Sequence, residues 1–521
     1  MDNNVAVSVR HITKAFGTKV VANKDVSLDI ERGEILALLG ENGSGKTTLM
    51  NMLSGIYHQD SGQIFVNGQE VHISSPKDAY GLGIGMIHQH FKLVDVFTAA
   101  ENVALGMDKK VAKNSRSIAK AIEEICNRYG FDVDPKKKVY NMSVSEKQTL
   151  EIVKTLYRGA NILILDEPTA VLTPQETDKL FAVLCNMKAD GKSIIIITHK
   201  LNEVLAISDR VSILRKGEYI GTVLTAEATV QSLTDMMVGQ KVELDIERPE
   251  VEDKQKRISV SHLTCLDKYG VKALDDVSFD AYGGEILGIA GISGSGQKQL
   301  LEAIAGLQHA EEGSSVVYID PESGKENDLI GKSVTEIKNM GVALSFVPED
   351  RLGMGLVGTM GMTDNMLLRS YKNGHSFFAD RKAPRELATK VKEELEVLTP
   401  NIQTPVRRLS GGNVQKVLVG REIASNPTVL MAAYAVRGLD INTSYTIYHL
   451  LNEQKKLGVA VIYVGEDLDV LLSLCDRIAI LCDGKLNGIL DGRTATKEEV
   501  GLLMTHLREE AAADGDSDTD A

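Results

Sequence analysis

Residues 33–49 read GEILALLGENGSGKTTL, and Gly40–Thr47 within them fit the pattern G-x-x-x-x-G-K-[ST]. The apolar run before Gly40 predicts a buried strand, and the residues from Lys46 onward predict a helix. Unless the match arises by chance in a glycine-rich turn, the backbone N–H groups and the helix end should surround a phosphate. We expect Lys46 to reach the β- and γ-phosphates and Thr47 to hold Mg²⁺. The loop and its continuation comprise Gly40, Glu41, Asn42, Gly43, Ser44, Gly45, Lys46, Thr47 and Thr48.

The same pattern of residues occurs a second time along the chain. Residues 284–300 read GEILGIAGISGSGQKQL, at an offset of 284 − 33 = 251. Residues 408–440 match 141–173 without a gap at an offset of 267, from RLSGGNVQ against NMSVSEKQ to VLMAAYAVRGLD against ILILDEPTAVLT. Such self-similarity predicts two homologous halves. We place the first half at residues 5–240 and the second half at 258–508. A charged linker at 241–257 joins them, and a disordered acidic tail follows at 509–521.

Short β-branched runs alternate with helical patterns in each half. GEILALLG, NILILDEP and KSIIIITH are apolar throughout, which is typical of parallel strands covered on both faces. Helical patterns follow Lys46, Glu146, Pro174 and Leu201. This alternation indicates the β-α-β arrangement of an α/β domain.

Two carboxylates, Asp166 and Glu167, end the apolar run ILIL. The carboxyl end of this strand is expected beside the phosphate-binding loop. There Asp166 would hold Mg²⁺ through water, and Glu167 would polarise the attacking water. The alternative is a pair of acids that caps a helix beginning near Pro168, and the presence of the phosphate-binding loop favours the catalytic interpretation.

Three further side chains are candidates for the same site. His199 ends the run IIIITH and is expected to contact the γ-phosphate, although a histidine at a strand end is more often structural. Gln89 is expected to sense the γ-phosphate and to contact Mg²⁺. His88 and His90 flank it like a metal pair, but no third ligand stands at a useful spacing, which favours ordinary loop residues. Phe16 either stacks on adenine or belongs to the core.

The second half carries another pattern suited to an anion. Leu409–Gln415 read LSGGNVQ and open a helix that continues from Lys416. Two glycines at the start of a helix leave backbone N–H groups accessible to an anion. This signal is weak alone and becomes specific beside a phosphate-binding loop and a strand ending in Asp-Glu. The candidates from this segment are Ser410, Gly411 and Gly412.

Together these motifs resemble the nucleotide-binding subunits of ABC transporters, over about residues 5–505. The resemblance rests on the Gly40–Thr47 loop, Gln89, the Leu409–Gln415 signature, the DEP strand end and His199. It implies an α/β fold with two tandem P-loop ABC domains. Each would have a RecA-like parallel or mixed sheet, a helical subdomain and an antiparallel β subdomain. It also implies hydrolysis of ATP with Mg²⁺.

Three phrases resemble the nucleoside branch of the importer ATPases. They are HQHFKLVDVFTAAENVALG (88–106), YRGANILILDEPTAVLTPQE (157–176) and FVPEDRLGMGLV (346–357). That branch implies nucleoside uptake through two integral-membrane permease subunits, with an extracellular lipoprotein that binds the substrate. It places the chain at the cytoplasmic face of the cell membrane. A ribose, galactose or xylose importer ATPase is the nearest alternative, and a tandem ABC ATPase without a transport role is a further one.

The two halves differ where the chemistry is carried. The aligned pairs are Lys46 and Gln297, Thr47 and Lys298, Gln89 and Glu349, Asp166 and Ala433, Glu167 and Tyr434, and His199 and Glu466. The signature shows the opposite pattern, because the second half keeps LSGG while the first reads MSVSE at 142–146. In the family, each ATP lies between the loop of one half and the signature of the other. The resemblance therefore implies an intramolecular pseudo-dimer with one complete site and one broken site.

Composition excludes several other classes of protein. The chain has 521 residues and a formal charge of −14, and it has no Trp. An acidic chain without an aromatic platform is not typical of nucleic-acid binding, so we expect no nucleic-acid partner. No apolar run approaches the roughly 18 residues that cross a bilayer, and no signal peptide is expected. A ribosome-acting tandem ATPase would keep two intact sites and a basic linker, and a P-loop kinase would lack the duplication.

Overall fold

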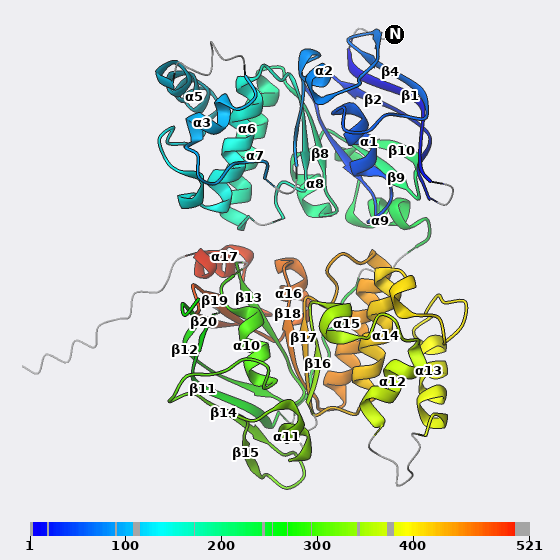
Figure 1. Cartoon of the computed structure of the whole chain (residues 1–521), viewed down its shortest axis with the longest axis vertical. Coiled ribbons are helices and arrows are strands. Elements are labelled where there is room, and N and C mark those ends of the chain that lie inside the picture. Colours follow the sequence, from blue (N-terminus) through cyan, green and yellow to red (C-terminus); the bar gives the residue numbers. More distant parts are fainter. Residues whose placement is uncertain are drawn as a thin grey trace, which may run out of the picture. The chain divides into compact units, whose positions relative to one another are not determined.

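The computed structural model describes residues 4–17, 20–88, 91–107, 115–170, 172–241, 245–252, 254–267, 269–292, 294–340, 344–371 and 380–505. The chain divides into two compact units, Met1–Leu244 and Asp245–Ala521 (Figure 1). The boundary falls inside the segment 241–257, and the predicted acidic tail at 509–521 lies outside the described residues. None of the helices in these ranges has the length and apolar composition needed to span a lipid bilayer.

The first unit is built on a six-stranded mixed sheet of order β10-β9-β3-β8-β7-β6. Its strands are β3 (Ile35–Leu39), β6 (Ile84–Ile87), β7 (Ile162–Asp166), β8 (Ser193–Ile197), β9 (Arg210–Arg215) and β10 (Glu218–Leu224). Neighbouring strands run parallel except β9 and β10. Every residue of β3, β7 and β8 is buried, which confirms the prediction from the three apolar runs.

An antiparallel sheet and a group of helices flank this mixed sheet (Figure 1). The antiparallel sheet has the order β2-β1-β4-β5, with β1 (Val5–Phe16), β2 (Val20–Glu31), β4 (Ser61–Val66) and β5 (Gln69–Val71). The helices are α1 (Lys46–Leu53), α2 (Pro76–Gly81), α3 (Ala99–Ala104), α5 (Ser115–Tyr129), α6 (Val144–Tyr157), α7 (Pro174–Ala189), α8 (Leu201–Ile207) and α9 (Val230–Val238). Helices α3, α5 and α6 share a core of their own around Val103, Ile122 and Leu150, and they form the predicted helical subdomain.

The second unit repeats this architecture. Its mixed sheet has the order β16-β17-β18-β13-β19-β20 and its antiparallel sheet the order β12-β11-β14-β15. The strands are β11 (Lys256–Leu266), β12 (Lys272–Tyr282), β13 (Ile286–Gly291), β14 (Ser315–Ile319), β15 (Glu326–Asp328), β16 (Leu344–Val347), β17 (Val429–Ala433), β18 (Ala460–Val464), β19 (Arg477–Cys482) and β20 (Lys485–Asp491). The helices are α10 (Gln297–Ile304), α11 (Val334–Asn339), α12 (Met362–Ser370), α13 (Lys382–Glu394), α14 (Gly411–Ile423), α15 (Ile441–Lys456), α16 (Leu468–Leu474) and α17 (Lys497–Thr505).

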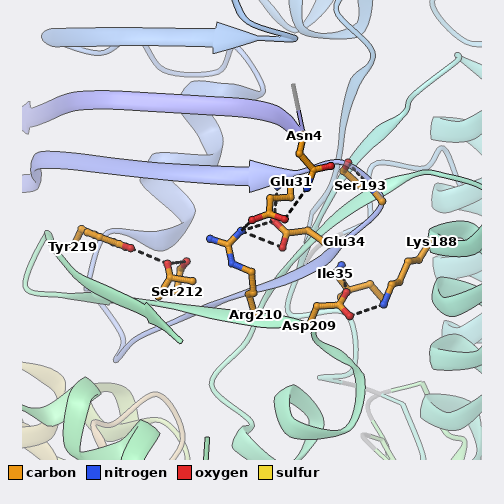
Figure 2. A network of polar contacts seen from close by, with 12 residues as sticks. Asn4, Glu31, Glu34, Ile35, Lys188, Ser193, Asp209, Arg210, Ser212 and Tyr219 are labelled. Carbon is orange, nitrogen blue, oxygen red and sulfur yellow. Dashed lines mark hydrogen bonds and ion pairs between the residues drawn. The ribbon is translucent and has the colours of Figure 1, made fainter. Parts of the chain in front are cut away.

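In the first unit, a network of hydrogen bonds and ion pairs surrounds the amino-terminal end of β3. Figure 2 shows Arg210 facing Glu31 and Glu34, with Arg210 Nη1 2.6 Å from Glu31 Oε1. Asp209, the residue before β9, accepts a hydrogen bond from the N–H of Ile35 at 2.9 Å. Side chains from β2, β3 and β9 therefore hold the strand that leads into the phosphate-binding loop.

The second unit keeps the same network at the aligned positions. Arg477 Nη1 lies 3.0 Å from Glu285 Oε1, and Asp476 accepts from the N–H of Ile286 at 2.8 Å. Asp476 also pairs with the fully buried Lys455 at 2.7 Å. The second unit thus retains these contacts at the corresponding end of its own sheet.

Candidate nucleotide-binding site

The turn between β3 and α1 leaves no room for side chains at Gly40 and Gly45. A Cβ at Gly40 would lie 2.2 Å from the carbonyl oxygen of Leu214, and one at Gly45 would lie 2.2 Å from that of Ala22. Gly45 has a φ of +96°, which residues with side chains rarely adopt, and it directly precedes α1. The backbone therefore turns tightly onto the start of the helix, as a phosphate cradle requires.

The Lys46 side chain is folded into this turn. Its Nζ donates to the carbonyl oxygens of Gly40 at 2.6 Å and of Glu41 at 3.0 Å, and the residue is 6% exposed. Burial lowers the pKa of this ammonium, while the carboxylates of Glu167 and Asp166 act against the lowering. A buried cation beside a glycine turn is suited to neutralising phosphate charge.

Thr47 and Asp166 supply neighbouring oxygen atoms beside the turn. Thr47 Oγ1 donates to Asp166 Oδ1 at 3.4 Å. Burial, the larger cause, and repulsion from Glu167, the smaller, together raise the pKa of Asp166 to about 6. Hydroxyl and carboxylate oxygens are ligands that Mg²⁺ prefers, and a cation beside them would favour the charged form of Asp166. These residues therefore fit the metal that the family implies.

The loop after β6 is only partly described. Gln89, the third predicted Mg²⁺ contact, lies outside the described residues, and so does His90. His88 is described, and burial lowers its pKa. Across the described ranges, no group of three or more His, Cys, Asp or Glu side chains is placed to hold a metal ion.

Glu167 and His199 meet at the carboxyl ends of the neighbouring strands β7 and β8. Glu167 Oε1 lies 2.9 Å from His199 Nδ1, and this hydrogen bond raises the pKa of His199. The other oxygen, Oε2, is buried and has no hydrogen-bond partner among the described residues. Glu167 also has a φ of +50°, an uncommon conformation for a non-glycine residue. One oxygen of a firmly held carboxylate is therefore left to accept a proton.

Phe16 lies at the surface of the first unit. It is 41% exposed, its ring packs edge-on against Tyr57 with centroids 5.3 Å apart, and Lys14 Nζ lies 5.6 Å from its centroid. The alternative that Phe16 belongs to the core is therefore wrong, and stacking on adenine stays a prediction. Tyr57 was not among the sequence candidates, because no local motif links it to Phe16.

The aligned region of the second unit is a cavity of about 240 Å³. Its lining comprises Lys298, Glu302, Phe346, Pro348, Glu349, Asp350, Met354, Ala433 and Tyr434. Three carboxyl side chains and one ammonium face this cavity, and burial raises the pKa of Glu302. Gln297, at the position of Lys46, donates to the carbonyl oxygen of Ile292 at 3.0 Å. This lining has Lys298, Ala433 and Tyr434 at the positions of Thr47, Asp166 and Glu167.

The two signature turns differ in charge. In the first unit, Ser143 and Glu146 form a capping box at the start of α6, and Lys137 Nζ lies 2.6 Å from Glu146 Oε1. In the second unit, α14 starts at Gly411 after Ser410, and Asn413 stands in place of the glutamate and donates from Nδ2 to Ser410 Oγ at 2.8 Å. A carboxylate therefore covers the first helix start, whereas a neutral amide covers the second.

The raised pKa of Asp166 predicts that Asp166→Asn stabilises the nucleotide-free chain. The folded state holds the proton more tightly than the unfolded state, so the carboxylate destabilises the fold above pH 6. We expect the variant to raise the free energy of unfolding of the first unit by about 2–3 kcal/mol at pH 7.5, since one pKa unit corresponds to roughly 1.4 kcal/mol. The gain should shrink as the pH falls from about 6 to 4, as followed by urea denaturation in EDTA.

A matched carboxylate in the second unit serves as the control. Asp476→Asn removes the charge that faces the buried Lys455, so this variant should lose stability at pH 7.5 rather than gain it. A loss of stability in Asp166→Asn at pH 7.5, or a gain that does not change with pH, would contradict the electrostatic origin of the effect.

A mixed sheet, a phosphate cradle and a strand-end acid pair define the first unit as a P-loop ATPase domain, and the second unit repeats its fold. The family model described as ABC transporter matches residues 23–170 and 274–432. The chain belongs to the ABC transporter family, whose ATP-binding subunits hydrolyse ATP.

Three relatives match nearly the whole chain. It is 40% identical to the nucleoside import ATP-binding protein NupA of Lactococcus lactis subsp. cremoris, over 97% of this chain and 99% of the relative. It is 40% identical to the guanosine import ATP-binding protein NupO of Bacillus subtilis, over 96% and 97%. The glucose import ATP-binding protein TsgD13 of Haloferax volcanii is 39% identical, over 95% of each chain.

Proposed function

We propose that this chain is the ATP-hydrolysing subunit of an ABC importer that takes up nucleosides through separate permease subunits. The names of NupA and NupO support this cargo, as do the three phrases that resemble the nucleoside branch. The ATPase itself does not select the cargo, because the permeases and the external lipoprotein contact it. Uptake of a monosaccharide is the second candidate, and it is favoured by the similar identity to the glucose importer subunit.

One observation carries the proposal of a single active site: the intact parts of a site are divided between the units. The first unit clusters Lys46, Asp166, Glu167 and His199 but has a carboxylate at its signature turn. The second unit has a signature turn without a carboxylate in its capping hydrogen bonds but lacks the catalytic set. The first unit's loop paired with Ser410, Gly411 and Gly412 gives one complete composite site.

Hydrolysis in this site follows from the free oxygen of Glu167. Oε2 accepts a proton from water while the water oxygen bonds to the γ-phosphorus and the bond from that phosphorus to the bridging oxygen of ADP breaks. Lys46 neutralises the β- and γ-phosphates, and His199 contacts the γ-phosphate from the end of β8. Mg²⁺, held by Thr47 and Asp166 together with Gln89, would neutralise phosphate charge when bound.

Exposed apolar side chains mark the surfaces proposed for the two permeases. In the first unit, Val96 and Tyr140 are 64% and 60% exposed, and the Tyr140 N–H donates to the carbonyl oxygen of Asp95. In the second unit, Leu352 and Met354 are 41% and 46% exposed. Both groups follow the segments at Gln89 and Glu349 and suit amphipathic helices from a membrane partner. This contact would hold the chain at the cytoplasmic face of the membrane.

Cosedimentation tests the transport role. We expect the chain to sediment with membranes only when two nucleoside-type permease subunits are coexpressed with it, and nucleosides to be taken up only when a substrate-binding lipoprotein is also present. Uptake of monosaccharides in place of nucleosides would favour the second candidate. If the chain stays in the supernatant with both permeases present, it is instead a tandem ABC ATPase without a transport role.

A further inference from the structure

The broken site of the second unit contains a cation that has no counterpart in the first. Arg437 follows β17, and at an offset of 267 its position corresponds to Ala170. Its Nη1 lies 2.5 Å from Glu349 Oε1, and its Nε lies 3.3 Å from Glu466 Oε1. Its guanidinium also lies over the ring of Tyr434, 5.8 Å from the centroid.

The partners of Arg437 are the residues aligned with the γ-phosphate contacts of the first unit. Glu349, Tyr434 and Glu466 stand at the positions of Gln89, Glu167 and His199. In the first unit those side chains are proposed to converge on an anion. In the second unit, two of the three aligned residues, Glu349 and Glu466, are acids, and they converge on the cation of Arg437. Arg437 thereby joins three segments, the loop after β16 and the ends of β17 and β18.

The same cluster reaches the signature turn. Arg351, two residues after Glu349, donates from Nη2 to the carbonyl oxygen of Arg437. Its other nitrogen, Nη1, lies 3.3 Å from where a Cβ at Gly411 would be. Asp350, between Glu349 and Arg351, accepts at Oδ1 from the N–H of Gly353 at 2.7 Å. The contacts therefore run from Glu466 through Arg437 to Arg351, and Arg351 Nη1 lies near Gly411, the first residue of α14.

We propose that Arg437 is a positioning residue that substitutes for a bound nucleotide in the second unit and holds the signature turn ready for ATP bound by the first unit. The positioning of the turn for ATP rests on the proposed composite site, whereas the bridging of the three segments does not. Each ion pair is partly exposed and weak alone. Together, however, the contacts of this one guanidinium with three segments form a network. Loss of Arg437 would leave the carboxylates of Glu349 and Glu466 close together without a cation between them.

Hydrogen exchange of the full-length chain tests the bridge. In the nucleotide-free protein, Arg437→Ala should speed exchange in peptides covering 344–357 and 465–467 by about five-fold or more, and Arg437→Lys should restore part of the protection. Arg381→Ala, which removes another arginine–carboxylate pair of the second unit, with Asp364, is the matched control and should leave these peptides unchanged. Unchanged exchange in Arg437→Ala would overturn the proposal.

Two further measurements separate a positioning role from a merely structural one. A double-mutant cycle on these exchange rates should show coupling between Arg437→Ala and Glu349→Gln. The reason is that Glu349→Gln removes the repulsion between carboxylates that Arg437→Ala exposes. ATP turnover of Arg437→Ala should fall about five-fold, while exchange of the first unit's phosphate loop stays unchanged. Faster exchange with unchanged turnover would overturn the positioning role. If the unaltered chain hydrolyses no ATP, the proposed function fails instead, and the exchange results still test the bridge.

Discussion

Replacement of Glu167 with glutamine should lower ATP turnover by about 10²-fold or more while ATP binding remains. Glutamine keeps the shape of the side chain and can still face His199 Nδ1, which now lies 2.9 Å from Glu167 Oε1. It cannot accept a proton at the buried position of Oε2, which has no partner among the described residues. The variant should therefore retain ATP, as measured by equilibrium binding of labelled nucleotide beside a phosphate-release assay.

The second unit provides the control for this variant. Gln297→Ala truncates the side chain at the position of Lys46 and removes its hydrogen bond to the carbonyl oxygen of Ile292. We expect this variant to hydrolyse ATP at nearly the normal rate. A collapse of its rate would show that the second pocket takes part in hydrolysis. Normal turnover in Glu167→Gln would remove Glu167 from the role of base.

The strands and the phosphate loop were predictable because their sequence signals are local. Uninterrupted apolar runs specify β3, β7 and β8 without reference to other residues. The phosphate loop is signalled by the local pattern G-x-x-x-x-G-K-[ST], although the carbonyl oxygens that exclude a Cβ at Gly40 and Gly45 belong to the distant residues Leu214 and Ala22. The fold and the position of the cradle therefore follow from short segments read one at a time.

The contacts that complete the site join distant residues, and their pairing could not be read from the sequence. Glu167 and His199 are 32 residues apart, and their hydrogen bond depends on β7 and β8 being neighbours in the sheet. Phe16 and Tyr57 meet across the antiparallel sheet and the helix α1. Arg437 lies in a loop without a motif, where the first half has alanine. Its role emerges only once Glu349 and Glu466 are seen on either side of it.

The charge difference between the signature turns also changes the meaning of a familiar pattern. Ser143 and Glu146 fit the capping-box pattern S-x-x-E, which by itself indicates only a well-formed start of a helix. If a turn with this glutamate faced a triphosphate, its carboxylate would repel the anion, an effect that the ion pair of Glu146 with Lys137 at 2.6 Å would only partly offset. Local helix stability and phosphate binding therefore favour different residues at this position, and the two units differ accordingly.

A reciprocal exchange of these residues tests which signature serves the active site. Asn413→Glu should form a capping box at α14 and place a carboxylate near the γ-phosphate. At about 5 Å and an effective dielectric constant of about 20, that repulsion is about 3 kcal/mol, so turnover should fall about 10²-fold. The matched change Glu146→Asn, in the first unit, should leave turnover nearly unchanged, because the proposed crossed arrangement pairs that turn with the broken site. Steady-state ATPase rates of the two variants, with circular dichroism to verify folding, provide the measurement.

The two variants distinguish the crossed arrangement from one in which each unit uses its own signature, because the two arrangements predict opposite pairs of results. If each unit used its own signature, Glu146→Asn would raise turnover by removing a carboxylate from the active site, and Asn413→Glu would have no effect. If neither turn contacted nucleotide, both variants would behave as the unaltered chain. Only a composite site, with Lys46 and Glu167 on one side of ATP and Ser410–Gly412 on the other, makes Asn413→Glu strongly inhibitory while Glu146→Asn is silent.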